Sequence, residues 1–407
     1  MWNSLKLIRE LLSRRSTTQR LKKALEVDPA NPEIHFNLAL AYAAAGQQMS
    51  AMEQYRAALA AKPDLSSASF NLALLLKESG DREGAIAVIQ QALQAAPLNE
   101  EMLPRLRHIM DFGHVPAWHF SMMNDGQRNA KYEQAIRAVV RPADGVLEIG
   151  TGAGLLAMLA VRHGARHVVS CEEVVPVALK AREIIKQNGC ESKITVIACR
   201  STEVRIPEGL SEPADILIAE IISSDLLGEG ILDSYEDARK RLLKPDARIM
   251  PCGATIVAQL AGAPELTPFL RVEEVAGFDM RSFNDFTPAL LPVDDLGVPL
   301  RAYSAAFDVF QFDLQGPDRI QPRCKTLAIP VTETGVCHGV LQWLRLQLCE
   351  GVQYENAPTD STPSPRRGHW RQILHVFRQP LDLEKGQILQ LVAAHDRSSL
   401  MFYPRPR

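Results

Sequence analysis

The sequence predicts a multidomain fold of class α + α/β + β, in which a helical repeat module precedes a doubly wound α/β domain and an antiparallel β-domain. Three observations lead to this prediction. The first quarter of the chain repeats with a fixed period, the middle alternates apolar runs with helical stretches behind a glycine-rich loop, and the region beyond Met250 alternates apolar and polar residues. The 407 residues, 46% of them hydrophobic, are enough for two or three cores. We expect domains at 1–112, 113–250 and 251–407.

Internal repetition organises the first domain. The same residue type recurs every 34 residues in six registers, among them Pro29, Pro63 and Pro97, then Ala24, Ala58 and Ala92, and Gly46 and Gly80. This is the period of tetratricopeptide (TPR) repeats, which contain one helix hairpin each: alanine lets the paired helices approach, glycine makes the turn and proline stops the second helix. Two full repeats over residues 30–97 follow a partial one. The module is either a helical spacer or a concave surface for a protein partner.

A glycine-rich loop opens the α/β domain. The apolar run GVLEI at residues 145–149 leads into Gly150, Gly152 and Gly154, and three more apolar runs follow with helical stretches between them. This order predicts a sheet whose ligand lies beyond the carboxyl ends of its strands. The glycine spacing departs from the dinucleotide fingerprint, which favours a nucleoside with an amino-acid tail over a pyrophosphate. Glu172, which ends the second run, is either the acceptor for both ribose hydroxyls or a solvated strand-end acid.

Two carboxylates follow the fourth apolar run. DILIAE ends at Glu220, and a Gly-Glu-Gly turn presents Glu229 nine residues later. Such a pair serves acid–base chemistry in some proteins, and it could also be two unrelated exposed acids. A guanidinium is a better ligand for it, because arginine is a permanently charged planar fork that two carboxylates bind through several charge-assisted hydrogen bonds. The spacing therefore points to a site that holds an arginine.

From about Ala117 to its end the sequence resembles the protein arginine N-methyltransferases, most closely the TPR-containing branch with a Gly-Glu-Gly loop. AEIISSDLLGEGIL matches the family's double-E loop, and HFSMMNDGQRNAKY matches the helix that covers its cofactor. The resemblance implies a Rossmann-like S-adenosylmethionine-dependent methyltransferase domain followed by a β-barrel. It assigns Glu220 and Glu229 to the substrate arginine and Asp125 to the bracing of the active site. With the glycine loop included, the cofactor-binding residues are then His119, Arg128, Glu148, Gly150, Gly152, Glu172 and Thr202.

Beyond Met250 the apolar residues alternate with polar ones. Phe310, Phe312 and Leu314 face one way, with polar residues between them, which predicts half-buried antiparallel strands. Together with turns rich in proline and glycine, these strands suggest a β-barrel or sandwich domain, and the resemblance implies the β-barrel that follows the cofactor domain in the family. It also implies that residues 275–300 are the projecting arm of the family.

A second motif lies near the end of the chain. GHWRQ at residues 368–372 resembles the family's Thr-His-Trp loop, with glycine in place of threonine. The resemblance makes His369 a catalytic residue that pairs with Asp125, and Trp370 a substrate-binding residue.

Composition narrows the function classes. The net charge is −3 and both signs are spread along the chain, so the sequence lacks the basic surface of a dedicated nucleic-acid binder. It contains no run of 18 apolar residues, so no membrane-spanning helix is expected. The start MWNSLKLIRELLSRR breaks its apolar run with charges, so we expect no secretory signal and a cytoplasmic protein. The seven scattered cysteines contain no Cys-x-x-Cys pair, so neither disulfides nor a metal site is expected.

Together these features predict an enzyme that uses S-adenosylmethionine to methylate guanidino nitrogens of arginine in protein substrates. Two alternatives stay open: a methyltransferase acting on a small guanidino or amino compound, and a TPR scaffold that has lost catalysis. We expect the TPR module to recruit the protein substrate or a separate partner. The resembling branch usually carries two catalytic modules, so a single module is expected to pair with a second copy as a homodimer.

Overall fold

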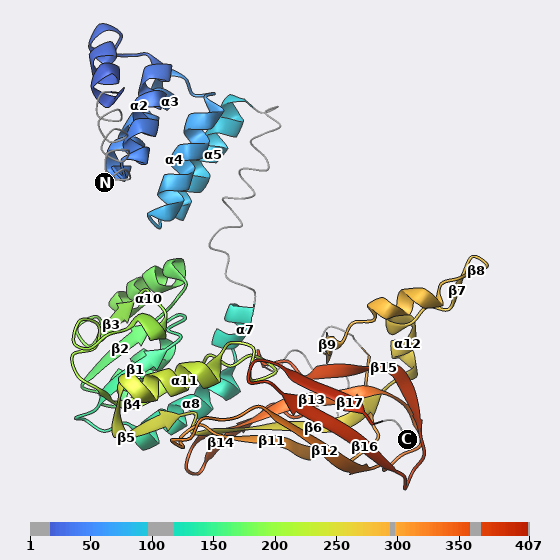
Figure 1. The fold of residues 1–407 in the computed structure, drawn as a ribbon. Helices are drawn as coiled ribbons and strands as arrows, with labels where there is room; N and C mark the ends of the chain where they lie inside the picture. Colours follow the sequence, from blue (N-terminus) through green and yellow to red (C-terminus); the bar gives the residue numbers. More distant parts are fainter. Residues whose placement is uncertain (1–16, 97–117, 294–297, 359–367, 406–407) are drawn as a thin grey trace, which may run out of the picture. The chain divides into compact units, whose positions relative to one another are not determined.

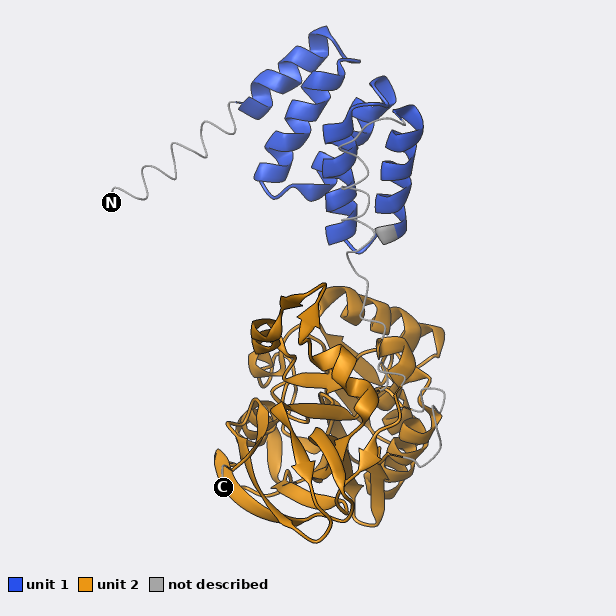
Figure 2. Cartoon of the chain, turned by 90° about the vertical axis from the view of Figure 1, so that its right-hand side faces the viewer, with its two compact units in different colours: residues 1–115 blue, residues 116–407 orange. Residues whose placement is uncertain are grey.

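The computed structural model describes residues 17–96, 118–293, 298–358 and 368–405. They fall into two compact units, Met1–Val115 and Pro116–Arg407 (Figure 2). The helical repeats, the doubly wound parallel sheet and the antiparallel strands that the sequence predicts are confirmed. The predicted boundary between residues 112 and 113 lies outside the described residues, and the boundary at 250 and 251 stays a prediction.

Two helix hairpins form most of the first unit. α2 (Pro32–Ala44) packs on α3 (Gln48–Ala61), and α4 (Ser66–Glu78) packs on α5 (Arg82–Ala95), after a helical stretch at residues 17–27 (Figure 1). Each hairpin is one TPR repeat, and the preceding stretch is the end of a third.

Glycine and alanine shape these hairpins. Gly46 and Gly80 lie between the two helices of each hairpin at φ +73° and +89°, a left-handed conformation that glycine adopts at little steric cost. Alanines at the repeated positions are buried where the helices meet, at Ala51, Ala58, Ala85 and Ala92. Because a methyl group is small, paired helices approach closely and the module needs few large residues in its core.

Five parallel strands form the sheet of the α/β region in the order β3-β2-β1-β4-β5. They are β1 (Gly145–Ile149), β2 (His167–Cys171), β3 (Ile194–Ile197), β4 (Ala214–Ala219) and β5 (Leu243–Met250). The strand order reverses between β1 and β4, so the loops that follow these two strands leave the carboxyl edge side by side. The helices of this region are α7 (Trp118–Met123), α8 (Gly126–Val139), α9 (Leu155–Arg162), α10 (Val175–Gln187) and α11 (Ile231–Arg241) (Figure 1).

Two antiparallel sheets make up most of the remainder of the second unit. The larger contains β6 (Gly253–Gly262), β9 (Leu290–Pro292), β10 (Arg301–Ala302), β11 (Phe307–Asp313), β13 (Gly335–Cys349), β14 (Val352–Glu355) and β15 (Ile373–Leu383). The smaller contains β12 (Arg323–Pro330), β16 (Ile388–His395) and β17 (Leu400–Pro404).

In the strand pairing of the described residues the predicted barrel is not closed, because neither sheet pairs with the other. The two sheets instead share one buried cluster, with Phe310 and Leu344 from the larger sheet and Leu391 from the smaller. Apolar faces that pack on each other bury the core without a continuous ladder of hydrogen bonds. The β-region is therefore better described as two packed sheets. Its core is continuous with that of the parallel sheet, because residues of β1 and β4 belong to the same cluster.

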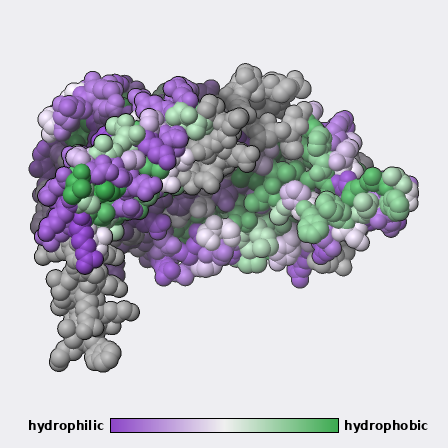
Figure 3. Space-filling model, turned by 90° about the horizontal axis from the view of Figure 1, so that it is seen from above, coloured by the Kyte–Doolittle hydropathy of each residue, from purple (hydrophilic) through white to green (hydrophobic). Residues whose placement is uncertain are grey.

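A short segment projects from the antiparallel sheets and overlaps the arm expected at residues 275–300, but it begins earlier, and β9 within that range pairs with β15 in the larger sheet (Figure 1). It contains α12 (Thr267–Leu270), the hairpin of β7 (Glu274–Val275) and β8 (Phe278–Asp279), and a 3-10 helix at Arg281–Phe286. Hydrophobic surface gathers on it (Figure 3), and its exposed apolar side chains include Phe269, Val275, Phe278, Met280, Phe283 and Phe286.

In the described part of the chain, no helix is long and apolar enough to cross a bilayer. No group of three or more His, Cys, Asp or Glu side chains among those residues is arranged to hold a metal ion. All seven cysteines are free thiols.

Candidate active site

The loop after β1 brings bare backbone next to the loop after β4. Gly150 has φ +85°, and a Cβ at this position would lie 2.8 Å from Ile221 Cγ2, so only glycine fits here without a shift. The N–H of Gly152 donates to Glu172 Oε2 at 3.0 Å, and the N–H of Val174 donates to the other oxygen of Glu172 at 3.0 Å. The carboxylate that follows β2 is therefore fixed beside the glycine loop.

Glu148 lies beneath this loop and is 1% exposed. Its Oε1 accepts the N–H of Ala157 at 3.1 Å, its Oε2 accepts the hydroxyl of Ser170, and that hydroxyl in turn bonds Thr151. Burial raises the pKa of Glu148 to about 8, against the effect of these hydrogen bonds. The structure therefore does not bring Glu148 to an exposed edge with Glu172; its contacts support the loop from below.

Two other predicted cofactor residues lie in the turn after β3 and in α7. Thr202 is exposed in the 3-10 turn Ser201–Glu203 that follows β3, and Arg241 Nη2 supports this turn by donating to the Ser201 carbonyl at 3.3 Å. His119 is half-buried in α7 and stacks on Trp118, with ring centroids 3.7 Å apart.

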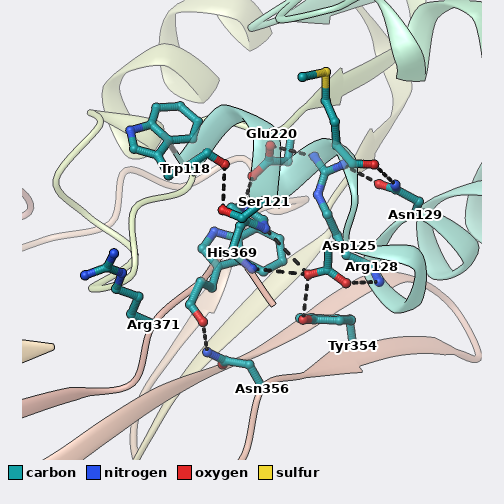
Figure 4. Close-up of polar contacts among 12 residues, drawn as sticks. Trp118, Ser121, Asp125, Arg128, Asn129, Glu220, Tyr354, Asn356, His369 and Arg371 are labelled. Atoms are coloured by element: carbon teal, nitrogen blue, oxygen red, sulfur yellow. Dashed lines mark hydrogen bonds and ion pairs between the residues drawn. The ribbon is translucent and has the colours of Figure 1, made fainter. Parts of the chain in front are cut away.

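Arg128 and Glu220 form a buried ion pair at the centre of the site (Figure 4). Arg128 Nη2 lies 2.6 Å from Glu220 Oε2, and Nη1 donates to Asn129 Oδ1 at 2.8 Å. The guanidinium also lies over the ring of Tyr132, 4.9 Å from its centroid. Arg128 Nε is buried and has no hydrogen-bond partner among the described residues.

Asp125 and His369 meet beside this ion pair. Asp125 caps α8 by accepting the N–H of Arg128 at 2.9 Å. Its Oδ2 lies 3.7 Å from His369 Nδ1, while His369 Nε2 lies 3.6 Å from Glu220 Oε1, so the imidazole stands between two carboxylates (Figure 4). Burial would lower the pKa of His369, but Asp125 and Glu220 outweigh it, and the pKa is raised. For Asp125 the directions are reversed: burial raises the pKa of its carboxyl, but His369 and the Arg128 N–H outweigh burial, and the pKa is lowered.

Tyr354 is a contact of Asp125 that the sequence did not reveal. Its hydroxyl lies 3.5 Å from Asp125 Oδ2, and its ring lies 5.3 Å from that of Trp370. A Cβ on Gly368 would lie 3.1 Å from Asp125 Oδ2 and 3.2 Å from the Tyr354 hydroxyl. The glycine that replaces threonine in the His-Trp motif therefore leaves space that the tyrosine uses.

The loop between the two glutamates is fastened by its own side chains. Ser223 Oγ donates to Asp225 Oδ1, and both oxygens accept the N–H of Gly228, at 2.7 and 3.0 Å. Leu226 has φ +76°, a costly conformation for a residue with a side chain, and is fully buried. The loop between the two glutamates therefore hooks back because polar bonds close it and a buried leucine anchors it.

The negative charge of Glu220 affects the pKa of Glu229. Although Glu229 is exposed along much of its side chain, partial loss of hydration raises the pKa of its carboxyl to about 7, and the charge of Glu220 adds to this while His369 opposes it. A carboxylate whose pKa is raised by the charge of a neighbouring carboxylate is positioned to bind one cation together with it.

The antiparallel sheets hold the same loop from outside. The indole N–H of Trp370 donates to the Ile222 carbonyl at 2.6 Å, and the N–H of Arg371 donates to Ser224 Oγ at 2.9 Å. Gln342 Nε2 donates to the Ser224 carbonyl at 3.1 Å. Trp370 is 3% exposed, so in this structure it is a partner of the loop rather than part of an open surface. A single glutamine in phase with the buried leucines of β13 is the sequence signal that could have revealed Gln342.

These residues fit S-adenosylmethionine. The glycine loop leaves backbone accessible to a nucleoside with an amino-acid tail, and Glu172 is fixed by backbone amides only, which leaves acceptor capacity for ribose hydroxyls. Arg128, with a buried Nε that lacks a hydrogen-bond partner in the described structure, matches a carboxylate.

Comparison with known proteins gives independent information. A family described as ribosomal protein L11 methyltransferase matches residues 133–258, and TPR repeat families match residues 19–46 and 66–97. A solved Trypanosoma brucei PRMT1 enzyme-prozyme heterotetrameric complex with AdoHcy aligns with a TM-score of 0.60 at 22% identity, covering 71% of this chain and 96% of that chain. This likeness shows a shared fold.

Two relatives found by sequence have higher identity to this chain than that solved structure has. An arginine N(omega)-methyltransferase of Streptomyces achromogenes subsp. streptozoticus is 34% identical over 278 residues, which cover 68% of this chain and 75% of that protein. Protein arginine N-methyltransferase 7 of Drosophila sechellia is 31% identical over 330 residues, covering 70% of this chain and 47% of its own length. The chain thus spans about half the length of the latter relative. At these identities and coverages, the chain belongs to the protein arginine N-methyltransferase family.

Proposed function

We propose that this chain transfers a methyl group from S-adenosylmethionine to a guanidino nitrogen of arginine residues in protein substrates. The observation that carries the proposal is the pairing of Glu220 and Glu229 across a closed loop, beside the Arg128 guanidinium and the glycine loop. Because the charge of Glu220 raises the pKa of Glu229, a permanent cation held between the two carboxylates would offset their repulsion, and arginine is the side chain that supplies one.

In this proposal Glu220 and Glu229 hold the substrate guanidinium and orient one terminal nitrogen. Arg128 and His369 contact Glu220 and thereby fix its direction before substrate arrives. When bound, S-adenosylmethionine supplies an electrophilic sulfonium methyl group. Glu172 and the backbone of the glycine loop would hold its nucleoside, and Arg128 its carboxylate.

The reaction does not require a strong general base. The methylated guanidinium is still a cation, so only its extra proton has to leave. Glu229, with a pKa of about 7, is able to accept a proton near neutral pH, and water at the exposed side of the loop is able to remove it. The Asp125 and His369 pair is a second route, because His369 Nε2 lies 3.6 Å from Glu220. Positioning supplies most of the rate in this account.

A small guanidino compound is the second candidate substrate. The name of the Streptomyces relative specifies arginine and not protein, and this chain covers 75% of that relative but only 47% of the Drosophila enzyme. In the third interpretation, a scaffold without catalysis, the chain would bind no cofactor. The fixed Glu172 and the closed double-E loop speak against it.

One experiment separates these possibilities. Calorimetry first measures binding of S-adenosylmethionine, and methyl transfer is then measured on free arginine and on a mixed pool of arginine peptides, with amino-acid analysis of the product. Transfer to peptides at a kcat/KM well above that for free arginine supports the proposal. Preference for free arginine favours the small-molecule reading, and absence of cofactor binding favours the scaffold.

The remaining partner and location assignments are also proposals. We propose that the TPR module recruits the protein substrate, since its hairpins stack as in peptide-binding repeats. The exposed apolar arm at Val275, Phe278, Met280, Phe283 and Phe286 supports a homodimer, because contiguous apolar surface of this kind marks interfaces. Free thiols at all seven cysteines support a reducing compartment, for which the cytoplasm is our proposal.

A further inference from the structure

A buried glutamine lies where the antiparallel sheet meets the double-E loop. Gln342 in β13 is 0% exposed, and its strand neighbours on the same face, Val340 and Leu344, are fully buried in the main core. Its Oε1 has no hydrogen-bond partner among the described residues. A buried carbonyl without a partner costs free energy, so an apolar side chain of the same size would suit this core better.

The other half of the amide has a partner. Gln342 Nε2 donates to the Ser224 carbonyl at 3.1 Å, and the hydroxyl of the same serine accepts the N–H of Arg371 at 2.9 Å. Ser224 lies midway between the two glutamates in sequence. Its carbonyl and its hydroxyl are thus held by β13 and by the segment just before β15, at the point where the loop turns back.

We propose that Gln342 is a positioning residue that fixes the double-E loop through Ser224 and so sets the place of Glu229 relative to Glu220. This proposal rests on the proposed function. Two other bonds tie the loop to the sheets, but Trp370 also fills core volume and Arg371 uses its backbone. The contact of Gln342 is therefore the one whose donor can be removed while volume is kept.

The unpartnered Oε1 of Gln342 and the donating Nε2 lead to opposite predictions, one for stability and one for activity. Removal of the unpartnered carbonyl should leave the fold as stable as before or more stable, whereas removal of the donor should loosen the loop. A residue with a purely structural role would lose stability and activity together. This split is the signature of a positioning role at this site.

The test is Gln342→Met, which keeps the length of the side chain and removes both polar groups. We expect an unchanged or higher Tm, unchanged affinity for S-adenosylmethionine, and a kcat/KM on an arginine peptide that is lower by about tenfold to a hundredfold, the size expected for a displaced substrate-binding group. Hydrogen exchange at the amides of Leu226 and Gly228, which bond inside the loop, should become faster.

Gln347→Met is the matched control. Gln347 lies on the same strand, and its Nε2 bonds the carbonyls of Cys349 and Val352 within its own sheet. This variant should keep the exchange rates of the loop amides and a kcat/KM within about twofold of the parent.

Unchanged loop exchange and kcat/KM in Gln342→Met would overturn the inference, as would a parallel loss of Tm, cofactor affinity and activity. If this variant does not fold, Gln342→Leu replaces it. Ser224→Ala, which removes the acceptor of the Arg371 N–H, is an independent test. It must make hydrogen exchange at the amides of Leu226 and Gly228 faster as well. If the parent chain methylates nothing, the proposed function fails, while the exchange measurement still decides the role of Gln342.

Discussion

Arg128 Nη2 lies 2.6 Å from Glu220 Oε2, and the two side chains are 3% and 6% exposed. The residue expected to bind the cofactor is therefore also the partner of a residue expected to bind the substrate. Removal of one member of a buried ion pair leaves the other charge uncompensated, at a cost of about 3–5 kcal/mol. The pair thus links the two halves of the proposed site, and a change on either side should affect both ligands.

Replacement of Arg128 by alanine tests this link. We expect S-adenosylmethionine to bind about ten to a hundred times more weakly, at about 1.4 kcal/mol per tenfold step, because the carboxylate of the methionine portion loses its cation. We also expect a higher KM for the arginine substrate, because Glu220 loses the group that orients it. Calorimetry and steady-state kinetics measure the two effects. Arg137→Ala, an exposed arginine on the same helix, is the control; equal cofactor affinity in both variants and the parent would mean that α8 has been misassigned.

Glu229→Gln should separate substrate binding from cofactor binding. The amide keeps the size of the side chain but removes one charged contact with the guanidinium, worth about 1.5–3 kcal/mol in binding and more in the transition state. Turnover should fall at least about a hundredfold while calorimetry finds near-normal affinity for S-adenosylmethionine. Near-normal methylation by this variant would rule out the double-carboxylate assignment. Glu208→Gln, an exposed glutamate between β3 and β4, should behave as the parent does.

The pKa of Glu229 predicts a pH dependence. Lost hydration and the charges of Glu220, Asp225 and Glu173 raise this pKa to about 7, against the opposing effect of His369. Below pH 7 the carboxyl is protonated and no longer attracts the guanidinium, so kcat/KM should rise as the pH increases through about 7 and then level off. A profile from pH 5.5 to 8.5 measures it, and Glu229→Gln should lack this limb. A parent profile that is flat across the range would contradict the assignment.

Much of this architecture follows from sequence because it depends on local patterns. The 34-residue period specifies the hairpins of α2 to α5, since every repeat buries the same small residues. The strand that ends at Glu220 and the glycines at 150 and 152 indicate the carboxyl edge of a doubly wound sheet, and the structure brings them together there. Such signals need no knowledge of distant contacts.

Contacts between distant segments were harder to predict. Tyr354 reaches Asp125 across 229 positions and Gln342 reaches Ser224 across 118, and no local period encodes either pairing. Trp370 illustrates the same limit: the motif named it as a substrate-binding residue, but it did not reveal that the buried indole N–H donates to the Ile222 carbonyl. The choice between a barrel and a sandwich was left open for a related reason, because alternation specifies which face of a strand is buried and not whether the last strand pairs with the first.

Glu148 predicts an unusual response of stability to pH. Burial raises its pKa to about 8 in the folded protein, while in the unfolded chain the pKa is near 4.5. The folded state therefore binds the extra proton between these values, and its stability falls as the pH rises from about 4.5 to about 8. Glu148→Gln mimics the neutral form and keeps an acceptor for the Ala157 N–H.

The difference in Tm between this variant and the parent should therefore grow in favour of the variant from pH 5 to pH 8.5, which thermal melts across that range can measure. Glu208→Gln controls for the loss of an exposed carboxylate. A Tm difference independent of pH would show that Glu148 is already ionised in the folded protein at pH 5.

The last prediction concerns the choice of substrate. A guanidinium looks the same in every peptide, so Glu220 and Glu229 alone cannot select one protein, and selectivity has to come from a surface further away. The TPR unit is the candidate, and it is compact in its own right. Deletion of residues 1–97 should spare methylation of short arginine peptides at high concentration but raise the KM for the physiological protein substrate, since remote binding energy and effective concentration are lost. Kinetics of both substrates with the full and the truncated chain measure this. If the truncated enzyme folds, binds cofactor and shows an unchanged KM for the protein substrate, the repeats are only a spacer. If it fails to fold, the TPR unit is needed for the stability of the catalytic unit.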